Sequence, residues 1–312
     1  MDAHTNGGRN KVSLILGGGG FIGTNLTEHL VRADQSVVSV SRSMRAGQEG
    51  VTEGIGYVVA DLAEPASYAA LLDAVDQVVY LASATTPGTS TGNPYFDIDA
   101  NLIPFLRFLE INAKARRPVI FASSGGTVYG RPQYVPIDEK HLTEPISPYG
   151  IVKLTMEKYL KYFAENHGFA YRILRIANPY GGRHHRRKDQ GVIDVFARKI
   201  VNDEKLVIWG NGGVVRDYVH ISDVCRGFIK AMEFTGPETV FNIGSGKGRS
   251  ILDIVDALCA HTGKKPELIF ENGRDYDIRE NVLDISRARE LLNWTPLRDF
   301  DDGLAETLRN IS

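Results

Sequence analysis

Residues 16–23, LGGGGFIG, decide the fold of this chain. They directly follow the apolar, β-branched run Val12–Leu16 and open an amphipathic segment, so they predict a tight turn between a strand and a helix. Glycines in this spacing let the turn close, let backbone amides approach a pyrophosphate and let the helix pack on the strand. No Gly-Lys-Ser or Gly-Lys-Thr follows, which excludes a P-loop. The turn predicts a dinucleotide-binding site made by Gly17, Gly20, Phe21, Ile22 and Gly23.

Strands and helices alternate through the first half of the chain, as in the repeated βαβ units of a parallel sheet. The expected strands are Val12–Leu16, Ser36–Val40, Gly56–Ala60, Gln77–Leu81, Val119–Ser123 and Tyr171–Ile176. The expected helices are Ile22–Ala33, Ala66–Ala74, Ile98–Lys114 and Tyr149–His167. We therefore predict an α/β fold with a Rossmann-type doubly wound parallel sheet, whose ligands bind at the carboxyl edge.

The regular alternation ends at residues 178–181, NPYG, where Gly-rich loops, short strands and separate helices begin. We expect residues 1–177 to form mainly the dinucleotide-binding domain and residues 178–312 mainly a smaller α/β lobe that binds the substrate. Part of residues 217–245 is expected to return to the first domain.

Composition excludes several classes of protein. The 312 residues are 43% hydrophobic with a net charge of -2, and no apolar run approaches the roughly 20 residues of a membrane span. This balance gives no global attraction to nucleic acid, and the polar first ten residues predict no secretion signal. Cys225 and Cys259 lie far apart with no CxxC or nearby His, so we expect free thiols, no metal and a cytoplasmic location. The basic run at 183–188 is expected to be a solvated loop, with help for an anionic ligand as the alternative.

The end of the second expected strand bears on the choice of dinucleotide. An acidic residue there holds the ribose hydroxyls of NAD, but this chain has Ser41, Arg42 and Ser43. A guanidinium and two hydroxyls can bind a 2′-phosphate, so NADP is favoured over NAD. Asp61 and Leu62, and Leu81 and Ala82, follow the third and fourth strands, where the adenine and the middle of the cofactor would pass.

Tyr149 and Lys153 are four residues apart, on one face of a helix that begins after Ser147. A tyrosine with its ordinary pKa near 10 is a poor base at pH 7, but an ammonium group and a positive nicotinamide ring lower that pKa. The spacing is common by chance, but here it follows the glycine turn and a Ser-Ser strand end. We therefore predict that the pair is catalytic.

Six segments resemble, in order, the motifs of extended short-chain dehydrogenases/reductases of the nucleotide-sugar epimerase/dehydratase group, and are UDP-glucose 4-epimerase-like. They are LGGGGFIG, FASSGGTVYG, SPYGIVK, ILRIANPYG, VVRDYVHISDV and FNIGSG. In that family a Ser or Thr ending the fifth strand bonds the sugar O4, the Tyr moves a proton and the Lys holds the cofactor ribose. The resemblance assigns the first role to Ser124. Many epimerases have one residue fewer before Val-Tyr-Gly, so Ser123 and Thr127 remain alternatives.

The resemblance also implies a substrate site in the second lobe. The residues assigned to the diphosphate and uridine are Asn178, Arg216, Arg274 and Asp277. For each Arg the alternative is a surface ion pair. Asn281 stands where a bulky Tyr excludes N-acetyl sugars in similar 4-epimerases, so it should admit them, unless it only turns the chain. Asn101 resembles an asparagine that supports the active-site helix, and we expect His220 to be structural.

Two reactions fit the motifs. Family dehydratases carry an Asp-Glu pair where this chain has Gly125 and Gly126, so dehydration is disfavoured. We expect a 4-epimerase of UDP-hexose or UDP-N-acetylhexosamine with a transient 4-keto intermediate. The alternative is an NADPH-dependent reductase of a nucleotide 4-keto-6-deoxysugar, and a non-catalytic nucleotide-sensing relative is a third class. Resemblance alone implies a homodimer through the helices Ile98–Lys114 and Tyr149–His167.

Overall fold

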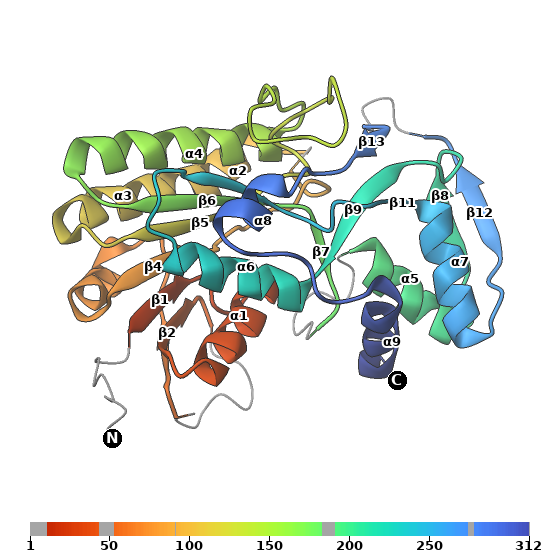
Figure 1. Ribbon diagram of the computed structural model, residues 1–312, viewed down its shortest axis with the longest axis horizontal. Helices are drawn as coiled ribbons and strands as arrows, with labels where there is room; N and C mark the ends of the chain where they lie inside the picture. The colour runs from red at the N-terminus through yellow and green to blue at the C-terminus, as the bar shows by residue number, and fades with distance from the viewer. Residues whose placement is uncertain (1–10, 44–52, 91, 183–190, 274–277, 312) are drawn as a thin grey trace.

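The computed structural model describes residues 11–43, 53–90, 92–182, 191–273 and 278–311. Its larger part is a seven-stranded sheet in the order β10-β6-β5-β4-β1-β2-β3, and every pair of neighbours is parallel (Figure 1). The strands are β1 (Val12–Leu16), β2 (Ser36–Ser41), β3 (Ile55–Val59), β4 (Gln77–Tyr80), β5 (Val119–Ser124), β6 (Tyr171–Ile176) and β10 (Val240–Ile243). The order reverses between β1 and β4, which confirms the predicted doubly wound fold. All six expected strands are present, with ends within one residue of the prediction.

Helices cover both faces of this sheet (Figure 1). They are α1 (Phe21–Arg32) and α6 (Ile221–Glu233) on one face, and α3 (Ile103–Ala115) and α4 (Pro148–His167) on the other. Leu14 and Ile15 are neighbours in β1, yet they belong to the two separate apolar cores, because successive strand side chains point to opposite faces. Near-continuous apolar strands are therefore required here.

The smaller lobe lies at the carboxyl edge of the large sheet, to the right in Figure 1. Its elements are β7 (Asn178–Tyr180), α5 (Val192–Val201), β8 (Leu206–Trp209), β9 (Val215–His220), β11 (Gly248–Ser250), α7 (Ile251–Thr262), β12 (Leu268–Glu271), β13 (Glu280–Asn281) and α9 (Phe300–Ile311). β9 pairs antiparallel with β11 and parallel with β7 and β13, and β8 pairs with β12. α8 (Ser286–Leu291) packs against β10 of the large sheet. The lobe has an apolar core of its own between α5, α7 and α9.

The expected α-helix at Ala66–Ala74 is wrong. The segment forms two 3-10 helices, η1 (Pro65–Ser67) and η2 (Ala69–Ala74), separated by Tyr68. Only Tyr68 and Leu72 are fully buried in this stretch, and so short a helix has little stability of its own. The Arg117 side chain binds the end of η2, where its Nε donates to the backbone oxygen of Leu72 at 2.8 Å.

The helix expected at Ile98–Lys114 begins earlier and contains an irregular turn. It consists of α2 (Pro94–Asp97), a π-helical segment η3 (Ile98–Leu102) and α3. Pro104 has no N–H, so it cannot donate the bond that would continue the α-helical ladder. A wider π turn accommodates this break, and such turns occur often at functional sites.

Two further features concern the environment of the chain. Within the described residues, no helix is both long and apolar enough to cross a membrane. Cys225 is buried in α6 and Cys259 is half-buried in α7, and both are free thiols. The polar residues 1–10 and the basic run at 183–188 lie outside the described residues.

Candidate active site

The glycine turn between β1 and α1 has a shape that fits a dinucleotide. Gly17 has a φ of +95°, and a Cβ on it would lie 2.6 Å from the backbone nitrogen of Ala82. A Cβ on Gly23 would lie 2.5 Å from the backbone oxygen of Gly17. Gly20 is the N-cap of α1. The helix therefore begins at the turn, and the positive end of its dipole faces the turn. The turn is a cradle of backbone that side chains would fill, as a close approach to a pyrophosphate requires.

The residues expected to line the cofactor gather along the same edge of the sheet. Leu81 continues β4 by donating its N–H to the oxygen of Leu16 at 2.8 Å, which places Ala82 beside the glycine turn. Phe21 and Ile22 are half-buried against the core of the α1 face. The sheet order thus brings β1 and β4, which are distant in sequence, to one site.

The ends of β2 and β3 lie farther along this edge. A Cβ on Gly19 would touch Ser41, so the end of β2 borders the turn. The Ser41 hydroxyl donates to the oxygen of Ser43 at 2.8 Å, while Arg42 is exposed. Asp61 is exposed and accepts from the N–H of Ala63, and Leu62 packs against the core under α3 and α4.

Tyr149 lies in the first turn of α4. The helix begins there because the Ser147 side chain caps the N–H of Gly150 and Pro148 occupies the first helical position. The N–H of Tyr149 donates to the Ser90 hydroxyl at 3.1 Å. A Cβ on Gly150 would lie 2.8 Å from the oxygen of Thr127, so this turn packs closely on the segment that follows β5.

Lys153 lies one turn later and is buried. Its Nζ donates to the oxygen of Ala122 in β5 at 3.0 Å and lies 5.8 Å from the centre of the Tyr149 ring. Burial lowers the pKa of Lys153 to about 8, and the nearby Glu157 carboxylate opposes that shift. The predicted Tyr-Lys pair is therefore brought together on one helix face.

The expected lowering of the Tyr149 pKa is not produced by the protein alone. Burial raises the pKa of Tyr149 to about 12; a hydrogen bond with Ser83 lowers it, and the Asp97 carboxylate raises it further. Burial wins because a phenolate loses more hydration energy than a neutral phenol. The expectation also relied on the positive charge of a nicotinamide ring. The protein groups around Tyr149 do not by themselves lower its pKa.

Three hydroxyls at or just after the end of β5 were candidates to contact the sugar. Ser123 is buried, and its hydroxyl already donates to the Glu157 carboxylate. Thr127 has a buried hydroxyl with no hydrogen-bond partner among the described residues. Ser124 is half-buried at the end of β5, and its hydroxyl has no protein partner among the residues that the structure describes. This environment favours Ser124.

The first of the two glycines after Ser124 has a packing reason. A Cβ on Gly125 would lie 2.6 Å from a methyl group of Leu283 and 3.1 Å from the oxygen of Arg175. The N–H of Gly125 also donates to the oxygen of Ile176 at 2.8 Å. β5 is therefore held against β6 one residue beyond the point where Ser124 leaves the sheet.

A buried ion pair supports α4 below Lys153. Glu157 and Arg175 are 3% and 5% exposed. Arg175 Nη2 lies 2.7 Å from Glu157 Oε2, and Arg175 Nε donates to Oε1 at 3.1 Å. The Arg175 guanidinium also lies 4.8 Å from the centre of the Tyr129 ring. Charge and hydrogen bonds here tie α4 to β6 and fix the helix that carries Tyr149 and Lys153.

The expected substrate residues are only partly described. Asn178 begins β7 and donates to the oxygen of Asp217 at 2.9 Å. Arg216 lies in β9 and donates to the oxygen of Ile278 at 2.7 Å. Arg274 and Asp277 lie outside the described residues. β9 therefore brings Asn178 and Arg216 to one small sheet.

Asn281 lies beside the end of β5, although it is far away in sequence. Its side chain is fully buried, and Nδ2 donates to the oxygen of Gly125 at 3.2 Å. Within the part of the chain that the structure describes, its Oδ1 has no hydrogen-bond partner. It pairs with Arg216 between β13 and β9, so it joins the end of β5 to the smaller lobe.

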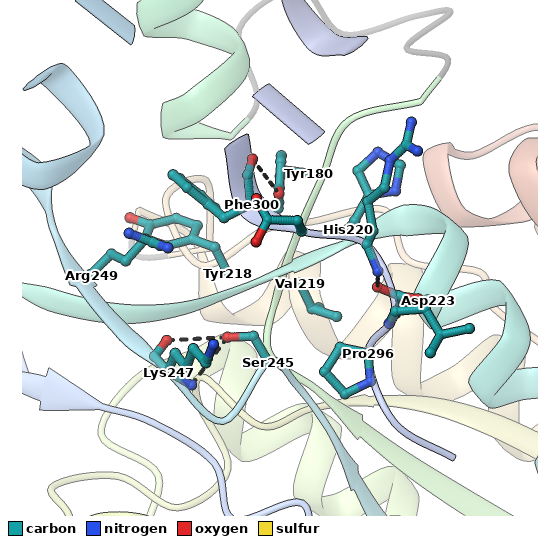
Figure 2. A pocket seen from close by; sticks show the side chains of 13 residues that line it. Tyr180, Tyr218, Val219, His220, Asp223, Ser245, Lys247, Arg249, Pro296 and Phe300 are labelled. Carbon is teal, nitrogen blue, oxygen red and sulfur yellow. Dashed lines mark hydrogen bonds between the residues drawn. The ribbon is translucent and has the colours of Figure 1, made fainter. Parts of the chain in front are cut away.

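A cavity of about 210 Å³ lies elsewhere, between β9, β11 and the segment before α9 (Figure 2). Its lining includes Tyr180, His220, Arg249 and Phe300, and the Arg249 guanidinium lies 3.8 Å from the centre of the Phe300 ring. His220 caps α6 through Ser222, which fits the expected structural role. Neither catalytic candidate of α4 lines this cavity.

Comparison with known proteins agrees with this geometry. Residues 13–244 match the NAD dependent epimerase/dehydratase family. The chain belongs to this family. It is 30% identical to a UDP-glucose 4-epimerase of Mycolicibacterium smegmatis, over 95% of this chain and 97% of that protein. It is 31% identical to a dTDP-4-dehydro-6-deoxyglucose reductase of Escherichia coli, over 100% of this chain and 99% of that protein.

A solved structure has the same fold as this chain. It is a UDP-glucose 4-epimerase of Thermotoga maritima with UDP-glucose, and its TM-score to this chain is 0.89 at 32% sequence identity. The likeness covers 96% of this chain and 98% of that one. The family membership predicted from the six motifs is therefore confirmed.

Three neighbours of Tyr149 were not predicted from the sequence. Ser83, Ser90 and Asp97 surround Tyr149 from loops and helices that precede it by more than 50 residues. No local pattern could have paired them with α4. Glu157 was detectable, because it lies four residues after Lys153 on the same helix face.

Proposed function

We propose that this chain is a nucleotide-sugar 4-epimerase that acts on a UDP-hexose or a UDP-N-acetylhexosamine through a transient 4-keto intermediate. The observation that carries the proposal is the Tyr149 phenol at the start of α4, one turn before a buried Lys153 that bonds β5. The same first turn packs on the segment after Ser124. A proton-transfer group, a cation and a hydroxyl therefore meet at the carboxyl edge of the sheet.

The side chains divide the work. The Ser124 hydroxyl bonds the sugar O4 and orients it, and Tyr149 takes the O4 proton and later returns it. Lys153 is held by Ala122 and binds the cofactor ribose. When bound at the glycine turn, the dinucleotide would supply the hydride chemistry at sugar C4, with no net change in its oxidation state over one epimerisation. Gly125 and Gly126 supply no acid or base for dehydration.

Product analysis tests this reaction. Purified protein would be incubated separately with UDP-glucose, UDP-N-acetylglucosamine and a nucleotide 4-keto-6-deoxysugar, with NADPH absorbance followed. A 4-epimerase converts one of the first two into its C4 epimer with no net change in the cofactor. Absence of an epimer together with stoichiometric loss of NADPH on the keto sugar would replace this proposal by the reductase.

The reductase is the second candidate because of Ser41, Arg42 and Ser43 at the end of β2. A reductase releases oxidised cofactor after each turnover, and NADPH is the usual donor for such a step. The similarity to the reductase of Escherichia coli supports this alternative. The same Tyr-Lys pair serves both reactions, since each needs one proton at O4.

We propose NADP as the preferred dinucleotide, read by Arg42. Replacing Arg42 by Ala should weaken NADP(H) binding by about tenfold or more and leave NAD(H) binding almost unchanged, because only NADP carries the 2′-phosphate. Fluorescence titration with both reduced dinucleotides measures this. Arg32→Ala, which alters an exposed arginine in the last turn of α1, is the matched control. Equal weakening for both dinucleotides would mean that Arg42 does not read the phosphate.

In the lobe, we propose that Asn178, Arg216, Arg274 and Asp277 hold the diphosphate and uridine, and that residues 178–312 serve mainly this task. Arginines suit phosphate oxygens, and a carboxylate can accept from ribose hydroxyls. The position of Asn178 and Arg216 on one small sheet supports this assignment.

Asn281 provides a test of sugar selectivity. Asn281→Tyr should depress kcat/KM for an N-acetylated substrate and spare its unacetylated counterpart, because overfilling a pocket penalises the ligand that needs the space. Thermal unfolding of the variant is needed beside the kinetics, since the Asn281 side chain is fully buried. Comparable losses on both substrates in a folded variant would place Asn281 outside the sugar pocket.

We also propose a homodimer through α3 and α4. Large side chains are exposed on this side of the molecule: Ile98 of η3 is 39% exposed, and Ile151, Tyr159 and Tyr162 of α4 are 51%, 39% and 58% exposed. Exposed apolar groups on neighbouring helices are typical of a contact surface. Sedimentation equilibrium gives the mass in solution, and a monomer at micromolar concentration would contradict the proposal.

A further inference from the structure

Asp97 is a buried carboxylate close to the catalytic tyrosine. It ends α2 and is 0% exposed. Its Oδ1 accepts from the Thr85 hydroxyl and from Asn101 Nδ2, the latter at 3.2 Å. Among the described residues, its buried Oδ2 has no hydrogen-bond partner and forms no ion pair. Leaving a buried acceptor unpaired is destabilising, so the position calls for a functional explanation.

Asp97 and Asn101 together hold the segment that follows β4. Asn101 Oδ1 accepts from the N–H of Ala84 at 2.7 Å, and Asn101 Nδ2 donates to the Thr85 hydroxyl at 3.0 Å. Thr85 in turn donates to Asp97. Ala84 and Thr85 are therefore anchored to the π turn by a closed set of hydrogen bonds.

This anchored segment contacts Tyr149 at two points. Ser83 precedes Ala84 directly, its hydroxyl donates to the oxygen of Thr85 at 3.0 Å, and its interaction with the phenol lowers the Tyr149 pKa. Ser90, at the far end of the segment, accepts from the Tyr149 N–H at 3.1 Å. The position of the phenol relative to Ser83 thus depends on the bonds that Asp97 and Asn101 make, some 50 residues earlier in the chain.

We propose that Asp97 is a positioning residue for Tyr149. Asp97 fixes Ser83 near the phenol, and it places a negative charge without a counter-ion beside the phenol. The inference rests on the proposed function in one respect: it takes Tyr149 as the group that moves the proton. Asp97 acts through Ser83 and through its charge, and it does not touch the substrate.

Asp97 and Ser83 affect the acidity of Tyr149 in opposite directions. The charged and titratable groups that face the phenol are Asp97 from α2 and Lys153 from its own helix. The Asp97 charge raises the Tyr149 pKa, while the bond to Ser83 lowers it. An anion favours the neutral phenol, and a donor favours the phenolate. Removing each one separately should therefore move the titration in different directions.

Asp97→Asn is the main test. An amide oxygen can still accept from Thr85 and Asn101, so the anchor remains while the charge is lost. We expect the acid limb of the kcat/KM pH profile to move to lower pH by about one unit. Asp99→Asn removes an exposed carboxylate from the same π turn and should leave the limb in place. An unmoved limb in a folded Asp97→Asn variant would overturn the charge role.

Thr85→Val tests the anchor separately. It removes the hydroxyl between Asp97 and Asn101 and should loosen Ser83, so the acid limb is expected to move to higher pH. If Asp97→Asn does not fold, this variant alone decides: a limb that stays in place overturns the proposal. A reduced kcat with no shift would mean that the cluster is only structural.

A spectroscopic readout separates this inference from the proposed function. Tyrosinate absorbance of the protein with bound dinucleotide, minus that of Tyr149→Phe, follows the ionisation of Tyr149 without any turnover. A midpoint lowered in Asp97→Asn and raised in Thr85→Val supports the inference even where no epimer is formed. Midpoints that match the unaltered protein in both variants would refute it.

Discussion

Replacing Tyr149 by Phe is expected to lower turnover by about 100-fold or more while leaving dinucleotide binding nearly intact. The change removes the hydroxyl that exchanges a proton with the substrate and keeps the ring that packs above Lys153. Steady-state kinetics on the substrate found by product analysis, together with a dinucleotide titration, measures both effects.

Tyr159→Phe is the matched control for this prediction. Tyr159 lies on the same helix but is 39% exposed, so losing its hydroxyl should change neither turnover nor binding. Near-normal turnover in Tyr149→Phe would reject the catalytic assignment of Tyr149. Loss of dinucleotide binding as well would point to a structural role instead.

Replacing Glu157 by Gln is expected to lower the free energy of unfolding by about 3–5 kcal/mol, the scale of breaking a buried ion pair. Gln is nearly the same size, but it leaves the Arg175 guanidinium buried without its counter-charge 2.7 Å away. It also weakens the bonds that Ser123 and Arg175 make to the carboxylate. Chemical denaturation, followed by circular dichroism, gives the free energy directly.

Glu165→Gln provides the comparison within α4. Its partner Lys161 is 3.7 Å away, and both side chains are 59% exposed. Solvent screens such a pair, so the loss should be at most about 0.5 kcal/mol. If Glu157→Gln costs no more than Glu165→Gln, the buried pair does not stabilise α4, and the support it gives to Lys153 must come from packing alone.

Several features of the fold could be predicted because their signals are local. The glycines at 17, 20 and 23 permit a tight turn that residues with a Cβ could not form, and the strand before them and the helix after them restrict it to one arrangement. The strands were found within one residue because each is a short apolar run bounded by turn residues. Two helix predictions failed for reasons that the apolar pattern does not contain. Arg117, which is distant in sequence, binds the end of η2, and Pro104 interrupts the hydrogen-bond ladder, so that a π turn precedes α3.

The candidate site divides in the same way. Tyr149 and Lys153 could be paired from the sequence, because residues four apart share a helix face wherever the helix goes. The resemblance assigned Ser124, with Ser123 and Thr127 as alternatives, but the sequence contained no physical reason to prefer one of them. For Ser123 such a reason is Glu157, which lies 34 residues away and accepts a hydrogen bond from its hydroxyl only when α4 packs on β5.

The sequence by itself therefore determined the doubly wound sheet, the dinucleotide turn, the Tyr-Lys pair and the family. Each of these depends on backbone conformation or on spacing within one element. Only the tertiary structure decided the surroundings of Tyr149. Burial and the Asp97 charge raise its pKa, and Ser83 lowers it. It also placed Asn281 against Gly125, 156 residues away. Burial and charge act through space, so they take their values from the chain segments that the sheet order brings together, and no local pattern contains that information.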